Sequence, residues 1–269
     1  MSPARATTST TLVYLYAILA QPSKDAIAGI DGAPVRWIRT EQLAAAVSNV
    51  AAEDFEEEPL NAHVRDMAWL GPRALAHQAV NAQLFEASDA SLPLAFGTVF
   101  RDDERVRRLL TEQSVELDTR LGKVRGCAEW VVTLHLLREP SEADAFAASP
   151  ALQALRSEIA ESSPGKAHLL RRQLATLTRD EVRRLQSDAA SEVLDSLDKI
   201  ATDLYREPLP QDSVEKPLLR TSLLVRRGDE NSFLDAMDQL RQRWREPSFR
   251  LLVSGPWPAY RFGGLPHAA

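Results

Sequence analysis

The stretch Leu92-Pro-Leu-Ala-Phe-Gly-Thr-Val-Phe100 decides how this sequence is expected to fold. Its composition predicts a strand, and period-two alternation places Leu92, Leu94, Phe96 and Phe100 on one face, which we interpret as core. An amphipathic helix is expected next, over Asp102–Leu121, because its apolar residues recur at steps of three and four. A second apolar strand is expected over Cys127–Leu137.

The same strand-helix-strand order recurs later in the chain. A strand is expected over Leu218–Arg226, a helix over Asn231–Trp244 and a strand over Phe249–Val253. Two such units are typical of the split βαβ, or ferredoxin-like, plan. With right-handed crossovers, the four strands would form one sheet with the helices on one face. We therefore expect an α+β protein whose C-terminal domain, residues 91–269, is ferredoxin-like.

A helical insert, at about residues 141–206, separates the two units. One candidate helix covers Ser141–Ile159 and a longer one covers Ala167–Leu204. Unbroken, the longer helix would extend roughly 55 Å at about 1.5 Å per residue. Either it breaks near Thr178-Arg-Asp180, where Thr and Asp are fair caps, or it projects and needs a partner helix.

A small α+β domain is expected over residues 1–90. Leu12–Leu19 reads as a buried strand and Val35–Arg39 as a half-exposed one. Leu43–Val50 is a strand or a short helix, and its place after a strand and a two-residue turn favours the strand. An acidic loop follows over Glu53–Pro59, and a helix is then expected from about Leu60 to Ala87.

Two local features complete this outline. Gly71-Pro72 falls within the expected 60–87 helix and predicts a kink or a break there. At the other end of the chain, a tail is expected over about residues 255–269.

Composition restricts the class of protein. The chain has 269 residues, of which 44% are hydrophobic, so two domains are expected. A net charge of -6 gives no support for nucleic-acid binding. Cys127 is the only cysteine, which excludes an intramolecular disulfide or a Cys-based zinc site and suits a reducing cytoplasm. The longest apolar run, Leu12–Ala20, is too short to span a lipid membrane.

The sequence shows no catalytic, cofactor-binding or metal-binding pattern. Its histidines are scattered, without metal-ligand spacing, at positions 63, 77, 135, 168 and 267. The acidic run Glu53–Glu58 has no calcium-loop pattern and is better explained as a solvated loop. Glycine-rich phosphate loops are absent. We therefore expect a protein that is not an enzyme and has no cofactor.

The C-terminal stretch Gly255-Pro-Trp-Pro-Ala-Tyr260 is the clearest candidate for partner contact. Its two prolines fix φ and remove two backbone donors, so it cannot continue a helix or sit in a central strand. Trp257, Tyr260 and Phe262 are the candidate partner-binding residues, although such rings more often serve as packing anchors.

Two motifs of this chain resemble those of the gas vesicle protein F/L family. Leu92–Phe100 resembles the family's LPLRFGTVF-type strand, with Ala95 where the family usually carries Arg. Gly255–Tyr260 with Phe262 resembles its C-terminal GPWPPYSF-type segment. Minor motifs fall in the expected order, so the resemblance extends from about Leu12 to Phe262.

The resemblance implies an accessory or minor structural protein of gas vesicles. Such a protein is expected to bind the small, hydrophobic main shell protein, prevent its aggregation, and support nucleation and assembly of the vesicle. Other gas vesicle accessory proteins are further expected partners, at the gas vesicle and in the cytoplasm. The alternative is a ligand-binding or sensor module, which follows from the ferredoxin-like fold alone.

Overall fold

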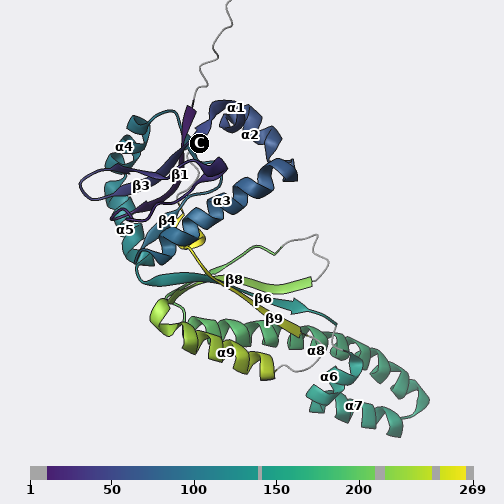
Figure 1. The fold of residues 1–269 in the computed structure, drawn as a ribbon. Coiled ribbons are helices and arrows are strands. Elements are labelled where there is room, and N and C mark those ends of the chain that lie inside the picture. The colour runs from purple at the N-terminus through teal and green to yellow at the C-terminus, as the bar shows by residue number, and fades with distance from the viewer. Residues whose placement is uncertain (1–10, 139–140, 210–215, 244–248, 265–269) are drawn as a thin grey trace, which may run out of the picture. The chain divides into compact units, whose positions relative to one another are not determined.

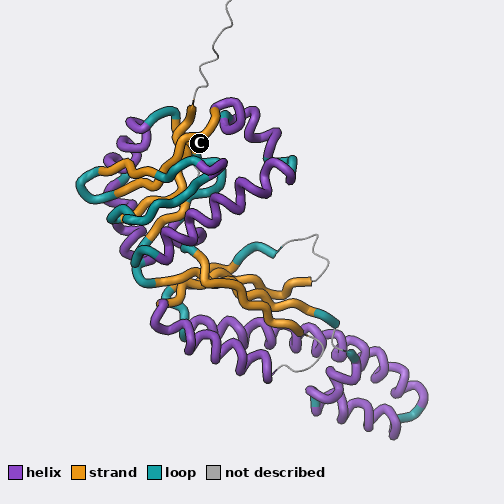
Figure 2. Tube along the Cα trace, in the orientation of Figure 1, coloured by secondary structure: helices purple, strands orange, loops and turns teal. Residues whose placement is uncertain are grey.

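The computed structural model describes residues 11–138, 141–209, 216–243 and 249–264. The chain divides into two compact units, one formed by Met1–Glu129 with Pro256–Ala269 and the other by Trp130–Gly255. Figure 1 labels the elements of both units, and Figure 2 distinguishes helices, strands and loops. The first unit continues past residue 90, where we expected a domain boundary, because two later strands join its sheet.

The first unit contains a sheet of order β2-β3-β1-β4, with β5 also paired to β1. Its strands are β1 (Thr11–Leu19), β2 (Arg36–Arg39), β3 (Ala44–Ala51), β4 (Ser91–Pro93) and β5 (Val99–Phe100). All residues of β1 from Leu12 to Leu19 are buried, as expected of a strand that is apolar on both faces. The strands predicted near β1, β2 and β3 are confirmed, including the strand alternative for residues 43–50.

Residues 92–100 do not belong to the sheet in which we expected them. Both β4 and β5 pair antiparallel with β1, so this stretch does not share a sheet with Cys127–Leu137. The physical reason is that a central apolar strand needs partners on both edges, and β3 satisfies only one. Residues 94–98 bulge between the two short strands, which breaks the expected alternation and takes Phe96 out of register with Leu92.

Gly97 lies in this bulge and its position requires glycine. Its φ is 85°, in the left-handed region that residues with a Cβ rarely adopt. A Cβ added there would lie 2.9 Å from Cδ2 of Leu60. The Gly97 N–H donates a hydrogen bond of 3.0 Å to the hydroxyl of Tyr14 on β1. The bulge is therefore held to the central strand by a side chain as well as by backbone pairing.

The helices of the first unit differ from expectation at their ends. They are α1 (Ala52–Phe55), α2 (Glu57–His63), α3 (Met67–Glu86), α4 (Asp103–Glu112), α5 (Ser114–Val124) and α10 (Tyr260–Gly263). The expected acidic loop is helical, because its carboxylates fall in first turns, where the helix dipole favours negative charge. Of the kink or break expected at Gly71–Pro72, the break is wrong, since α3 starts at its cap Asp66 and runs through Pro72.

The second unit contains a sheet of order β7-β8-β6-β9. Its strands are β6 (Cys127–Leu136), which begins in the first unit, β7 (Asp203–Arg206), β8 (Lys216–Arg226) and β9 (Phe249–Trp257). The strands predicted near β6, β8 and β9 are confirmed. We did not predict β7, because its residues continue the apolar spacing of the preceding helix.

Helices α8 (Pro164–Asp198) and α9 (Glu230–Arg243) cover one face of this sheet (Figure 2), and a short η2 turn (Arg227–Asp229) precedes α9. The Trp130 ring on β6 lies 5.1 Å from the Phe233 ring on α9, centroid to centroid. This contact fixes which face of β6 is covered. The predicted helix near α9 is confirmed up to Arg243, and Trp244 lies outside the described residues.

The long helix of the insert does not break. It has 35 residues and passes through Thr178, whose hydroxyl donates to the carbonyl of Leu174 one turn earlier. Of the two alternatives, the partner helix is therefore the one observed, because α6 (Glu142–Ala148) and α7 (Pro150–Glu161) both pack on α8. The single helix expected over Ser141–Ile159 is wrong: it is divided at Ser149, and Pro150 begins a new helix.

The C-terminal stretch Gly255–Tyr260 completes a strand and then leads into a short helix. Strand β9 runs through Trp257, and Pro256 is tolerated there because β9 is an edge strand. The chain then enters α10, which belongs to the first unit. Of the expected tail, residues 265–269 lie outside the described part of the chain.

Candidate partner-binding surfaces

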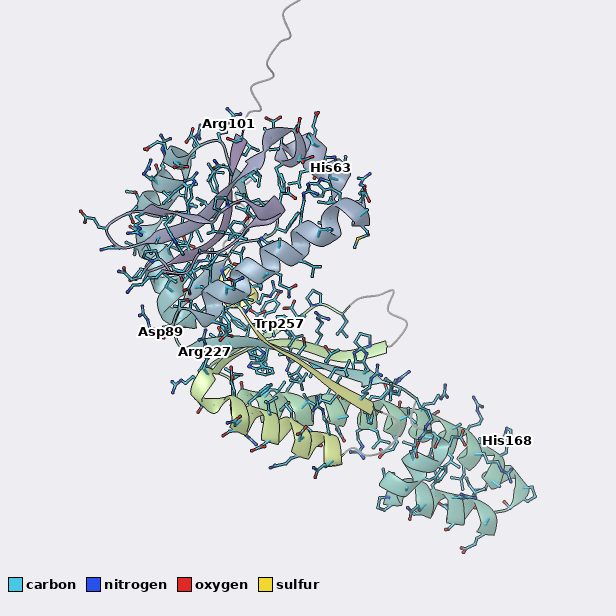
Figure 3. The ribbon with its side chains drawn as sticks, viewed as in Figure 1. His63, Asp89, Arg101, His168, Arg227 and Trp257 are labelled. Atoms are coloured by element: carbon cyan, nitrogen blue, oxygen red, sulfur yellow. The ribbon has the colours of Figure 1, made fainter. Side chains whose placement is uncertain are left out.

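The three candidate aromatic residues have different environments. Phe262 is 8% exposed, and the Lys123 ammonium lies 5.5 Å from the centre of its ring. Tyr260 is half-buried, and its hydroxyl hydrogen-bonds the side chain of Asn81 on α3. Trp257 is 36% exposed and is labelled in Figure 3. Tyr260 and Phe262 therefore anchor the segment, and Trp257 is the most exposed of the three.

Backbone contacts also hold the C-terminal segment in place. The N–H of Arg261 donates to the Glu129 carboxylate at 2.7 Å, and the Arg120 guanidinium donates to the carbonyl of Gly264. A Cβ on Gly263 would lie 3.0 Å from Cδ2 of Leu92 on β4, so the segment approaches the first sheet closely. The motif Leu92–Phe100 and the C-terminal motif Gly255–Tyr260 with Phe262 are thus brought together in the fold, although they lie far apart in the sequence.

His77 occupies the centre of a buried polar network. The Tyr14 hydroxyl, which accepts from the N–H of Gly97, also shares a hydrogen bond of 2.9 Å with Nδ1 of His77. The side-chain amide of Asn81 lies 3.1 Å from Nε2 of His77, and Asn81 in turn bonds Tyr260. The network therefore connects β1, the 94–98 bulge, α3 and the C-terminal segment.

Burial sets the protonation states in this network. Desolvation lowers the pKa of His77 to about 4, although a hydrogen bond to the backbone of Leu94 partly opposes this shift. Desolvation also raises the pKa of Tyr14, and it raises the pKa of Tyr260 to about 12. At neutral pH all three groups are uncharged. His77 is 5% exposed and both its ring nitrogens have partners, so the site is built to hold structure rather than to reach a substrate.

An aromatic cluster surrounds this network. The Phe96 ring of the bulge lies 5.8 Å from His77 and 6.1 Å from Tyr14. The Trp69 ring stacks on His63, and the Arg73 guanidinium lies 4.4 Å over the centre of Trp69. Arg73 also pairs with Asp31 at 3.1 Å. The inner side of α3 is therefore fully occupied by packing.

The outer face of α3 is unusual because it is both exposed and uncharged. Between Met67 and Phe85 the helix carries a single charged residue, Arg73, and that residue is on the inner side. Met67 is 71% exposed and Leu75 is 68% exposed. Small residues lie beside them, at Ala68, Gly71, Ala79 and Ala82. The exposed Gln78 and Gln83 are polar but also uncharged. An exposed helix face that carries large apolar side chains and no charge is a candidate contact surface.

Sequence reasoning missed this surface. The apolar spacing of residues 60–87 predicted a helix, but it did not identify Met67 and Leu75 as exposed. A helix with one buried face usually carries charged residues on its exposed face. The scarcity of charged residues on both faces of this helix could therefore have indicated the surface.

The histidines that we considered for metal binding lie on different elements. Of those in the described part of the chain, His63 lies on α2 beside Trp69 and His168 lies on α8 (Figure 3), and His135 lies on β6. His267 lies outside the described residues. Among the described residues, no group of His, Cys, Asp and Glu has the arrangement of a metal site. None of the described helices is long and apolar enough to cross a membrane.

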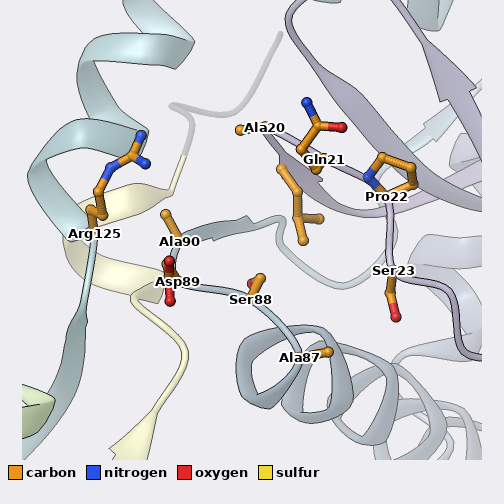
Figure 4. Close-up of a pocket in the computed structure, with 10 residues that line it drawn as sticks. Ala20, Gln21, Pro22, Ser23, Ala87, Ser88, Asp89, Ala90 and Arg125 are labelled. Carbon is orange, nitrogen blue, oxygen red and sulfur yellow. The ribbon is translucent and has the colours of Figure 1, made fainter.

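A cavity of about 220 Å³ lies where β1 and α3 end in the first unit (Figure 4). Its lining includes Gln21, Ser23, Asp89 and Arg125, together with alanines and Pro22. This volume is below the range of about 300–1,000 Å³ that is usual for small-molecule sites. The residues that line the cavity all belong to the first unit.

Comparison with known proteins gives a consistent result. A model of the family described as "Gas vesicle synthesis protein GvpL/GvpF" matches residues 12–263. Gas vesicle protein L of Streptomyces sp. (strain CB03234) is 32% identical, over 88% of this chain and 86% of that protein. Gas vesicle protein F of the same strain is 30% identical, over 85% of this chain and 87% of that protein.

Solved structures match the same fold. The crystal structure of GvpF from Microcystis aeruginosa superposes with a TM-score of 0.68 at 20% identity, covering 94% of this chain and 99% of that one. That of GvpF from Anabaena sp. PCC7120 gives 0.69 at 17% identity, covering 96% and 100%. The arrangement of mixed helices and two sheets is therefore shared with these proteins.

Proposed function

The chain belongs to the gas vesicle GvpL/GvpF family, and from this premise we propose that it is a non-enzymatic accessory or minor structural protein of gas vesicles. In this proposal it binds the main hydrophobic shell protein, prevents its aggregation and supports nucleation and assembly of the vesicle. It acts at the gas vesicle and in the cytoplasm, together with other gas vesicle accessory proteins. The family match over residues 12–263 is the observation that carries the proposal.

The outer face of α3 supports the proposed binding. A subunit that buries its apolar surface only in a polymer is prone to aggregate before assembly. A partner that covers such a surface needs an exposed apolar face of its own, without charges that would be left unpaired on contact. Met67 and Leu75 provide this face, and the uncharged residues around them extend it along α3.

The C-terminal aromatic residues take distinct parts in the proposal. Trp257 is a second contact for the partner, because its ring is the exposed one. Tyr260 and Phe262 hold the segment that carries Trp257, through Asn81 and the Lys123 side chain. This division separates residues whose loss would weaken binding from those whose loss would unfold the segment.

We also assign the second unit to the ferredoxin-like plan, with different strands from those first expected. The strand and helix order β6-α8-β7-β8-α9-β9, with sheet order β7-β8-β6-β9, supports this assignment. In this assignment β6 is the first strand of the plan, where Leu92–Phe100 was expected, and β7 is the second strand. The α6–α7 pair is an addition to the first crossover.

A ligand-binding module is the second candidate function, and the cavity beside Asp89 and Arg125 is the observation that favours it. Screening nucleotides and small anions for a thermal shift tests this alternative. A shift that Arg125→Ala abolishes would favour it over shell binding.

The proposed function is tested by coexpressing the chain with the main shell protein and measuring copurification and shell solubility. The proposal expects the shell protein to remain soluble and to copurify with the chain. Absence of binding, combined with normal vesicle formation after deletion, would exclude the proposed role.

A further inference from the structure

Two exposed helical surfaces of opposite charge remain outside the site described above. The first, the acidic end of α2, consists of Glu56, Glu57 and Glu58. These three carboxylates are exposed, and no ion pair to them is formed among the described residues.

The second surface is the basic face of α8. Residues 164–179 contain four basic residues and no acidic one. Leu169, Arg172, Thr176 and Arg179 are spaced by three and four residues, so they form one row along the helix. This row is exposed, and it lies opposite Ala167 and Thr178, which are buried on the side that packs against α6 and α7.

The arginines of the basic face have no acidic partners in the described part of the chain. Arg172 forms no ion pair there, and the Arg179 Nε donates to the carbonyl of Ala175 in its own helix. Arg183 and Arg184, just beyond the row, are already paired with carboxylates of α8. The positive charge of the row is therefore available to another molecule, beside the exposed Leu169.

We propose that copies of this chain associate head to tail, with the acidic end of α2 in one copy contacting the basic face of α8 in the next. Charge complementarity identifies a second copy as the occupant, because one chain carries both halves of the contact. Each pairing sets three carboxylates against two arginines, beside the exposed Leu169. This inference concerns the chain alone and does not depend on shell binding.

One-way, head-to-tail pairing is heterologous, so each associated copy keeps one surface free and the contact extends into rings or open chains. Reciprocal pairing of both surfaces in two copies would instead close a dimer. Because the paired charges are exposed, salt screens them, and association should weaken as ionic strength rises.

Sedimentation velocity of the full chain, over about a hundredfold range of concentration at ~0.1 M and ~1 M salt, tests the proposal. The weight-average sedimentation coefficient should rise with concentration at low salt and rise less at high salt. A value independent of concentration at low salt would overturn the proposal, whether or not the chain binds a different partner.

Two charge-reversed variants make the test specific. E57K/E58K and R172E/R179E should each remain monomeric, because each brings like charges together at the contact. An equimolar mixture should associate again, because each variant's altered surface then complements the other variant. A failure to fold cannot produce this restoration.

The control R108E/E112K reverses exposed charges on α4, which contributes to neither surface, and should associate like the unmodified chain. If either reversed variant also associates like the unmodified chain, or if the mixture remains monomeric, the proposed pairing is wrong.

Discussion

Tyr14 on β1 and His77 on α3 form a buried hydrogen bond of 2.9 Å between the phenolic oxygen and Nδ1. Tyr14 also accepts the N–H of Gly97, so one hydroxyl joins the central strand, the bulge and the longest helix of the first unit. His77 extends the connection through Asn81 to Tyr260 in the C-terminal segment. This relationship explains why residues from distant parts of the sequence are needed together.

Replacing Tyr14 with Phe should destabilise the chain by about 1–3 kcal/mol, because the Gly97 N–H and His77 Nδ1 each lose a buried partner. Urea unfolding followed by circular dichroism measures this loss. Tyr16→Phe provides a comparison, because the Tyr16 hydroxyl bonds Ser48 and the N–H of Ile30 but not His77. An unchanged unfolding midpoint for Tyr14→Phe would contradict the network.

Acid should destabilise the first unit through His77. The pKa of His77 falls from an ordinary 6.5 to about 4 in the folded chain, so the unfolded chain binds the proton more readily. The contribution of neutral His77 is therefore complete above pH 6.5 and is lost as the pH falls from there towards about 4. The loss should total about 3 kcal/mol, at 1.36 kcal/mol per pKa unit.

His77→Gln separates this effect from the titration of other groups. The variant lacks the titrating ring, so its stability should depend less steeply on pH between 4 and 6.5 than that of the unmodified chain. Equal slopes in urea unfolding at several pH values would show that His77 is not the responsible group.

Gly97→Ala should cost about 1–3 kcal/mol, because the residue has a φ of 85° and its new Cβ would press on Leu60. Gly32→Ala is a matched control for backbone strain, since Gly32 has a φ of 75° but open space around it. Gly122→Ala, in α5 with open space, should be neutral or stabilising. Thermal unfolding should rank the three in this order, and equal costs at Gly97 and Gly32 would show that the Leu60 contact is unimportant.

Phe262→Ala and Trp257→Ala should have different effects. Phe262 is buried, and its loss should cost about 3 kcal/mol and expose the C-terminal segment to proteolysis. Trp257→Ala should cost less than Phe262→Ala, because Trp257 is 36% exposed. Limited proteolysis and copurification with the shell protein distinguish the two, since Trp257→Ala should weaken binding in an intact chain.

The sequence predicted the elements that follow simple periodicity. The run from Leu12 to Leu19 is apolar at every position, so its burial in a central strand followed directly. The strand at β8 and the helix at α9 were also found where expected. These elements are decided by local pattern, which is visible without tertiary structure.

The errors have identifiable physical causes. Gly97 marked a bulge, but only the pairing with β1 shows that 92–100 is two short strands of the first sheet. Pro72 suggested a break, yet α3 continues past it, because tertiary packing of its inner side outweighs one lost hydrogen bond. The candidate site could be predicted only in part: Trp257 was identified, but the exposure of Met67 and Leu75 depends on which helix face packs inward.

Copurification of the main shell protein with a Met67→Asp/Leu75→Asp variant most directly tests the proposed binding role of α3. The variant should unfold within about 0.5 kcal/mol of the unmodified chain, because both side chains already face water. Val115→Asp is the matched control, since Val115 is equally exposed but lies on α5. We predict that the α3 variant loses the shell protein while the control retains it. Equal recovery of the shell protein with both variants would contradict the proposed binding surface.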